Sequence, residues 1–108
     1  MELLDFLVKK EDPAIQEYER ILQEYNRALA LNDKDPDLWD RKCLVLMKLG
    51  KSEEAIDAGK KGVQIAPDDP ELWDSLRLAY LGSSNREKAD ECQKHLSGLI
   101  KQKNEKES

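Results

Sequence analysis

Cysteine and histidine are scarce in this sequence, which has two Cys and one His among 108 residues. Two thiols are too few for a disulfide scaffold or a thiolate metal site, and both Cys43 and Cys92 fall inside a helical pattern, which predicts reduced, buried thiols. No arrangement of Asp, Ser or Cys accompanies His95 to orient it as a general base. We therefore expect a structural His95 and a protein without catalysis, metal or cofactor.

Long apolar runs are also missing, since no stretch approaches the ~20 residues that a membrane span requires. Residues 1–10 place the acids Glu2 and Asp5 ahead of apolar residues, unlike a secretion signal, so we expect a cytoplasmic protein that does not contact membranes. The net charge is −5. Because nucleic-acid binding requires a basic surface, we expect no nucleic-acid partner.

Charged residues, in contrast, make up 38% of the chain, against about 25% in typical soluble domains. An internal repeat then decides the expected architecture. Placing residues 36–69 over residues 70–103, a shift of 34 residues without a gap, yields eight identities, among them both tryptophans, Trp39 and Trp73. A fixed period of this kind is typical of solenoids, whose units cannot bury their apolar faces alone.

Each unit carries the signals of two helices. Asp35 and Asp69 stand directly before a proline, which is the pattern of an N-cap residue followed by the first helical position. Gly50 is expected to end one helix, Ser52 to cap the next, and Pro67 to block its continuation. These signals predict hairpins over residues 36–66 and 70–103, preceded by one over about 2–32 whose long helix starts at Asp12 and Pro13.

Two kinds of residue within the units predict close helix packing. Trp39 and Trp73 occupy the same place in each unit, so we interpret them as structural residues that pack between helices. Gly59 and Gly62 each cost about 1 kcal/mol relative to Ala inside a helix. Their presence indicates that another helix packs very close to them.

These residues resemble the tetratricopeptide repeat, a 34-residue helix–turn–helix with the pattern W-x2-L-G-x2-Y, then A-x3-F, then P. The pattern is matched at Trp73, Leu76, Tyr80 and Ala89 in one unit and at Trp39, Leu46, Ala55 and Pro67 in the other, with departures at Lys42, Gly59, Arg77 and Gln93. The resemblance implies an all-α fold, a right-handed α-solenoid of about three antiparallel hairpins forming a single domain over residues 1–103. Residues 104–108 lack apolar side chains, which predicts a disordered C-terminal tail.

In proteins similar to this one, the first helices of successive repeats line a concave groove that holds a peptide or a helix of a partner. The resemblance implies that this groove would present the partner-binding residues Asp37, Asp40, Leu44, Met47, Lys48, Glu71, Asp74, Leu78 and Leu81. Their acidic and apolar side chains favour a protein partner with basic and apolar residues, and hence a protein-interaction adaptor or scaffold. The alternative is that Leu44 and Leu78 belong to the core and that the acids stabilise the first turns of their helices.

A second function is suggested by the N-terminal residues. Residues 3–8 contain more apolar side chains than one helical stripe can hide, namely Leu3, Leu4, Phe6, Leu7 and Val8. They either cover the open end of the stack or join two copies in a homodimer. The second possibility would make this chain a structural self-assembly protein.

Overall fold

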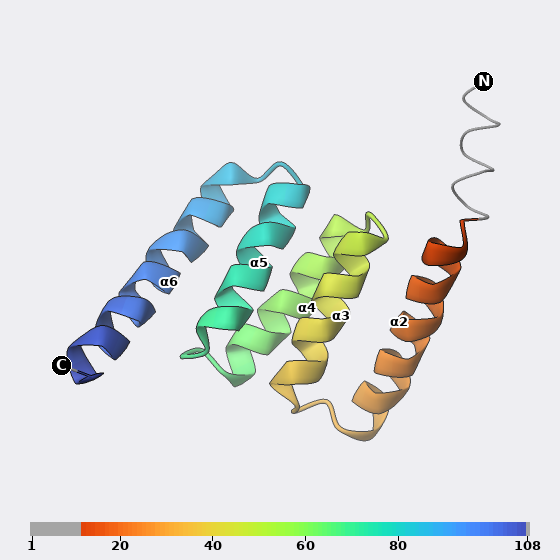
Figure 1. The fold of residues 1–108 in the computed structure, drawn as a ribbon, viewed down its shortest axis with the longest axis horizontal. Helices are drawn as coiled ribbons and strands as arrows, with labels where there is room; N and C mark the ends of the chain where they lie inside the picture. Colours follow the sequence, from red (N-terminus) through yellow and green to blue (C-terminus); the bar gives the residue numbers. More distant parts are fainter. Residues whose placement is uncertain (1–11, 108) are drawn as a thin grey trace.

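The computed structural model describes residues 12–107, and within that range every regular element is an α-helix (Figure 1). The helices are α2 (Pro13–Leu31), α3 (Pro36–Lys48), α4 (Ser52–Ile65), α5 (Pro70–Gly82) and α6 (Arg86–Glu107). Helices α3 and α4 form one hairpin and α5 and α6 the next, as the two predicted units require. Residues 2–11 of the first predicted hairpin lie outside the described residues, and α2 is the long helix predicted to start at Asp12 and Pro13.

Contacts between successive helices arrange the hairpins into a stack. Helix α2 packs against α3, α4 packs against α5, and α3 also contacts α5. Helices α4 and α6 both contact α5 without contacting each other. The first helices of the two hairpins therefore lie together on one side of the stack, while their second helices stand apart on the other. This confirms the expected fold class of stacked antiparallel hairpins.

The three predicted helix starts share one geometry. The side chains of Asp12, Asp35 and Asp69 accept hydrogen bonds from backbone N–H groups two residues later, at 2.9, 3.0 and 3.0 Å. Each Asp is followed by a proline at the first helical position. These caps satisfy N–H groups that have no partner inside the helix, which is why the Asp-Pro signal identified the starts correctly.

The turn inside each hairpin is also repeated. Gly50 has a φ of +74°, and the N–H of Lys51 donates to the carbonyl of Leu46 at 2.8 Å. At the matching place in the next hairpin, Ser84 has a φ of 63° and the N–H of Asn85 donates to the carbonyl of Tyr80 at 2.9 Å. Both turns form the Schellman motif, which closes a helix through a left-handed residue.

Two sequence predictions about helix ends are wrong. Ser52 is the first residue of α4 and not its cap, because the turn through Gly50 already places Lys51 in the capping position, without a side-chain hydrogen bond. The predicted disordered tail is helical at residues 104–107, since α6 continues to Glu107. Lys, Gln and Glu are strong helix formers, and no Gly or Pro interrupts them.

The core runs along the contacts between α3, α4, α5 and α6. Its fully buried large side chains are those of Cys43, Leu46 and Leu72. Leu76 packs on Gly59, where an added Cβ would lie 3.0 Å from its Cδ1, and Leu72 packs on Gly62, where an added Cβ would lie 2.7 Å from its Cδ2. The predicted close approach at both glycines is therefore confirmed, and α5 is the helix that packs on them.

Candidate partner-binding face

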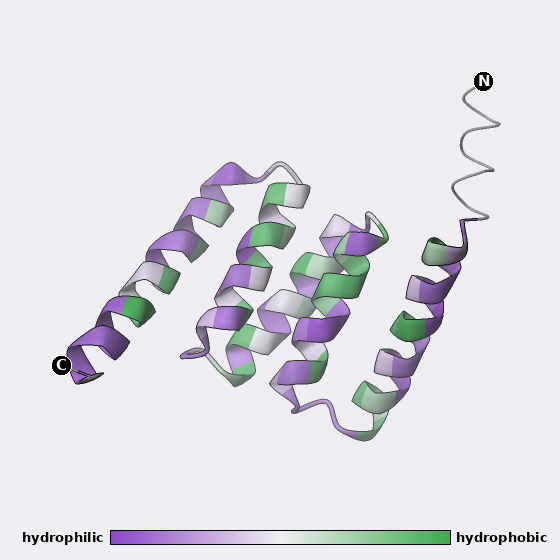
Figure 2. Ribbon diagram, in the orientation of Figure 1, coloured by the Kyte–Doolittle hydropathy of each residue, from purple (hydrophilic) through white to green (hydrophobic). Residues whose placement is uncertain are grey.

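The first helices, α3 and α5, bring the predicted partner-binding residues to the surface of the stack. Leu44 and Leu78 are each 38% exposed and Leu81 is 41% exposed. The interpretation of Leu44 and Leu78 as core residues is therefore wrong. Figure 2 shows hydrophobic residues concentrated in the middle of the stack, whereas α6 is largely hydrophilic. The other predicted residues are half-buried (Asp40, Met47, Asp74) or exposed (Asp37, Lys48, Glu71).

Asp40 has the most unusual surroundings of this group. Its Oδ1 atom is buried and has no hydrogen-bond partner. Burial raises the pKa of Asp40, the Ser75 hydroxyl lowers it, and the nearby carboxylates of Glu71, Asp69 and Asp37 raise it further. The structure thus gathers carboxylates from α3 and α5 around one buried oxygen, and we call Asp37, Asp40, Asp69 and Glu71 the acidic cluster. No Lys or Arg among residues 12–107 forms an ion pair with it.

Asp74 occupies the same position as Asp40 in the next repeat, yet its charge is balanced. The Arg77 guanidinium donates to Asp74 Oδ1 from Nη2 at 2.7 Å and from Nε at 3.1 Å. Arg77 is about three-quarters buried. At the matching position of the α3–α4 hairpin stands the neutral Cys43. Asp40 and Asp74 therefore differ in their surroundings, since Asp74 has an ion-pair partner and Asp40 has none among residues 12–107.

Arg77 and Ser75 were not recognised as site residues from the sequence. The spacing of Asp74 and Arg77, three residues apart on one helix, is a recognised signal for an ion pair and could have identified Arg77. Nothing local pointed to Ser75, because it reaches Asp40 from a different helix. Leu81 lies away from the acidic cluster. It lines a different cleft, toward α6, together with Arg77 and Arg86.

Part of the acidic face also serves the helices themselves. Asp37 and Glu71 lie in the first turns of α3 and α5, where the positive end of the helix dipole favours acids. Lys48 lies in the last turn of α3, where the dipole favours a base. The dipole interpretation therefore accounts for these three residues, but it does not apply to Asp40, which lies beyond the first turn.

Both tryptophans are fixed by the same contact in each repeat. The indole N–H of Trp39 donates to the carbonyl of Asp33 at 2.8 Å, and that of Trp73 donates to the carbonyl of Pro67 at 2.7 Å. In each case the acceptor lies in the loop before the helix. The half-buried rings pack on the core, which supports the structural interpretation of both residues.

The cysteines and the histidine have structural surroundings. Cys43 and Cys92 are free, buried thiols, as predicted. Burial raises the pKa of Cys43 to about 12 and also raises the pKa of Cys92. His95 lies on the exposed side of α6, with its ring centroid 4.0 Å from that of Trp73. Within residues 12–107 no group of three or more His, Cys, Asp or Glu side chains is placed to hold a metal ion.

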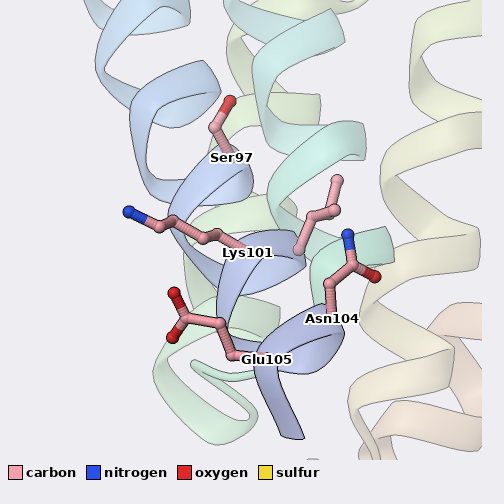
Figure 3. Close-up of a pocket in the computed structure, with 5 residues that line it drawn as sticks. Ser97, Lys101, Asn104 and Glu105 are labelled. Atoms are coloured by element: carbon pink, nitrogen blue, oxygen red, sulfur yellow. The ribbon is translucent and has the colours of Figure 1, made fainter. Parts of the chain in front are cut away.

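One further surface feature, a cavity on α6, is not a candidate binding site. A cavity of about 470 Å³ near the end of α6 is lined by Ser97, Ile100, Lys101, Asn104 and Glu105 (Figure 3). Because all of these residues belong to one helix, the cavity is an open strip of its surface.

None of the helices in the described part of the chain is long and apolar enough to cross a membrane.

The stacked hairpins define the fold as helical repeats of the tetratricopeptide-like kind. Two solved structures of MamA are similar to this chain, with TM-scores of 0.76 and 0.78, 28% sequence identity and 85% of this chain covered in both. This chain spans about half of each, 50% and 54%. A third structure, MamA MSR-1 C2, shares the fold at 20% identity and a TM-score of 0.76, covering 83% of this chain and 52% of its own. No family model matches the sequence, and the comparison with curated proteins finds no match.

Proposed function

We propose that this chain is a non-catalytic interaction module that holds a segment of a partner protein against the face formed by α3 and α5. The observation that carries the proposal is the buried, unpartnered Oδ1 of Asp40 inside the acidic cluster. A buried oxygen without a hydrogen bond is costly, and a carboxylate surrounded by other carboxylates costs more. A cationic side chain from a partner, placed beside the exposed carboxylates of Asp37 and Glu71, would relieve the repulsion within the acidic cluster.

The partner segment follows from the chemistry of the face. A Lys or Arg side chain would reach Asp40 and the carboxylates of Asp69 and Glu71. Apolar side chains on the same segment would cover Leu44 and Leu78, whose exposed surface is otherwise in contact with water. An amphipathic helix or an extended segment with basic and apolar residues on one side meets both requirements.

The absence of catalysis is part of the same proposal. The two thiols have pKa values raised by burial, so they are neutral near pH 7 and poor nucleophiles. The ring of His95 stacks on Trp73 and makes no hydrogen bond or ion pair with another side chain of residues 12–107. These surroundings support a binding role and provide no nucleophile–base pair within the described residues.

The test is a binding titration with a defined probe. A fluorescein-labelled helical peptide with Lys and Leu on one face is titrated with the native chain and with Asp40→Asn, followed by fluorescence anisotropy. A hydrogen bond to a charged group contributes about 1.5–3 kcal/mol, so Asp40→Asn is expected to weaken binding by roughly ten- to a hundredfold. Asp74→Asn is expected to weaken it by less than about threefold, because Arg77 already balances Asp74.

Glu19→Gln is the matched control, since Glu19 is an exposed acid on α2 away from the face. It should leave binding unchanged, and a version of the peptide with Glu in place of Lys should not bind to any variant. Equal losses with Asp40→Asn, Asp74→Asn and Glu19→Gln would mean that only net charge matters, and the proposed face would be rejected.

Self-assembly through residues 3–8 remains the alternative function, and the same variants distinguish it. Sedimentation velocity of the native chain would then show a concentration-dependent dimer. Asp40→Asn would leave that dimer intact, whereas Leu4→Ser with Phe6→Ser would abolish it. A monomer at all concentrations, with peptide binding that depends on Asp40, supports the interaction module.

A further inference from the structure

A second groove lies on the opposite side of α5 from the acidic face. Helices α4 and α6 do not contact each other, so α5 forms the floor between them. The groove has a volume of about 380 Å³, within the range of roughly 300–1,000 Å³ that ligand pockets have. We call it the Trp73 groove; its floor includes Trp73, Leu76 and Tyr80, and its rim includes Lys60, Lys88 and His95.

The preceding repeat contains the matching groove, and the comparison shows what is special about this one. At Trp39 the ammonium groups of Lys42 and Lys61 lie 5.4 and 5.3 Å from the centre of the indole ring. That ring already has cationic partners, and the groove beside it has a volume of only about 220 Å³. In the Trp73 groove, Leu76 stands in place of Lys42 and His95 in place of Lys61. The two lysines beside Trp39 are thus replaced, beside Trp73, by one apolar and one aromatic side chain.

The rim of the Trp73 groove carries one positive charge that no ion pair balances within the described residues. Lys88 is ion-paired with Glu91 at 3.3 Å, so these two charges balance within the groove. Lys60 is exposed and forms no ion pair with any of the residues that the structure describes. The hydroxyl of Tyr80 likewise makes no hydrogen bond within residues 12–107. An apolar floor is therefore bordered by an unpaired cation and an unused hydrogen-bond donor.

We propose that the Trp73 groove is a second docking site, which receives a large apolar side chain of a partner protein that has a carboxylate close beside it. The apolar side chain would lie on the partly exposed rings of Trp73 and Tyr80, and the carboxylate would face Lys60 and the Tyr80 hydroxyl. This chemistry is opposite in charge to the segment proposed for the acidic cluster. The module would then hold two different segments on the two sides of α5.

The experiment uses a short amidated peptide with a central Phe between two Glu residues, titrated into the isotopically labelled full chain and followed by two-dimensional NMR. The indole N–H signal of Trp73 and the backbone signals of Tyr80 and His95 are expected to shift. An exposed ion pair contributes about 0.2–1 kcal/mol, so Lys60→Glu, which turns attraction into repulsion, should weaken binding by roughly two- to tenfold. Lys94→Glu is the matched control, because Lys94 occupies the same place one repeat later and does not line the groove.

Each outcome decides the proposal. Peptides with Ala in place of Phe, or with Lys in place of Glu, should bind clearly more weakly, and Lys94→Glu should bind like the native chain. Equal weakening by Lys60→Glu and Lys94→Glu, or shifts confined to α3, would overturn the Trp73 groove as the site. Concentration-dependent shifts of Trp73 and His95 without peptide would show that a second copy of the chain occupies the groove, which also overturns it. None of these results depends on Asp40, so the two proposals fail or stand separately.

Discussion

Replacing Gly62 with alanine sets two effects of similar size against each other. Alanine is favoured over glycine in a helix interior by about 1 kcal/mol. The added Cβ, however, would lie 2.7 Å from Cδ2 of Leu72 and 3.6 Å from Cβ of Trp39. Carbon atoms in contact normally lie about 3.5–4.0 Å apart, so Leu72 must move by roughly 1 Å.

Leu72 has little room for that movement, because it is only 1% exposed. Overpacking of a dense core typically costs about 1–3 kcal/mol. The expected result for Gly62→Ala is therefore a net loss of about 1 kcal/mol in the free energy of unfolding. Urea unfolding followed by circular dichroism measures it, provided that the dependence on denaturant is unchanged.

Gly98→Ala is the matched control, since Gly98 also lies inside a helix but an added Cβ there meets nothing within 4 Å. It should stabilise the chain by about 0.5–1 kcal/mol. Combining Gly62→Ala with Leu72→Val, which shortens the clashing side chain, should cost less than the sum of the two single changes. If Gly62→Ala stabilises the chain as much as Gly98→Ala does, the close approach of α4 and α5 is refuted.

Three further changes test other parts of the structure. Ser84→Gly should raise the free energy of unfolding by about 1 kcal/mol, and the melting temperature by several degrees, because Ser84 holds a left-handed conformation that glycine adopts freely; an unchanged melting temperature would argue against that turn. Burial raises the pKa of Asp40, so the folded chain binds more protons than the unfolded chain, and stability falls as pH rises from the ordinary Asp value of 3.8 through the raised one. Asp40→Asn should therefore stabilise the chain at pH 7 and lose this advantage below pH 3.8, as thermal melts across that range would show. Finally, a thiol reagent at pH 8 should label Cys43 only after urea unfolds the chain, since burial raises its pKa to about 12; rapid labelling of the native chain would contradict its burial.

Much of the architecture was readable from local signals in the sequence. The Asp-Pro pairs and Gly50 act within a few residues of themselves, through hydrogen bonds to neighbouring backbone groups, so they identify helix ends without any knowledge of the fold. The failure at Ser52 has the same origin, because two local signals competed there and the Gly50 turn determined the outcome. The resemblance of the two units then predicted the stack and the packing at Gly59 and Gly62.

The site was predictable only in outline. The repeat placed Asp40 and Asp74 in equivalent positions on equivalent helices, and both do lie at the surface of the stack. Their difference depends on the residues around them, since Arg77 balances Asp74 from the same helix while Asp40 faces Ser75 and Glu71 on another helix. A period detects what successive repeats share, and it is insensitive to the substitutions that make one repeat different.

By itself, the sequence determined the repeat length, the three helix starts at Asp-Pro pairs and the position of each tryptophan, because these depend on hydrogen bonds and apolar spacing along one segment. Only the tertiary structure decided that Leu44 and Leu78 are exposed, that an oxygen of Asp40 is buried without a partner and that a groove opens beside Trp73. Burial and electrostatic surroundings at these residues depend on contacts between separate helices, as in the contact of 3.8 Å between Cys43 Sγ on α3 and the carbonyl of Ser75 on α5. Such contacts arise from the packing of one hairpin on the next.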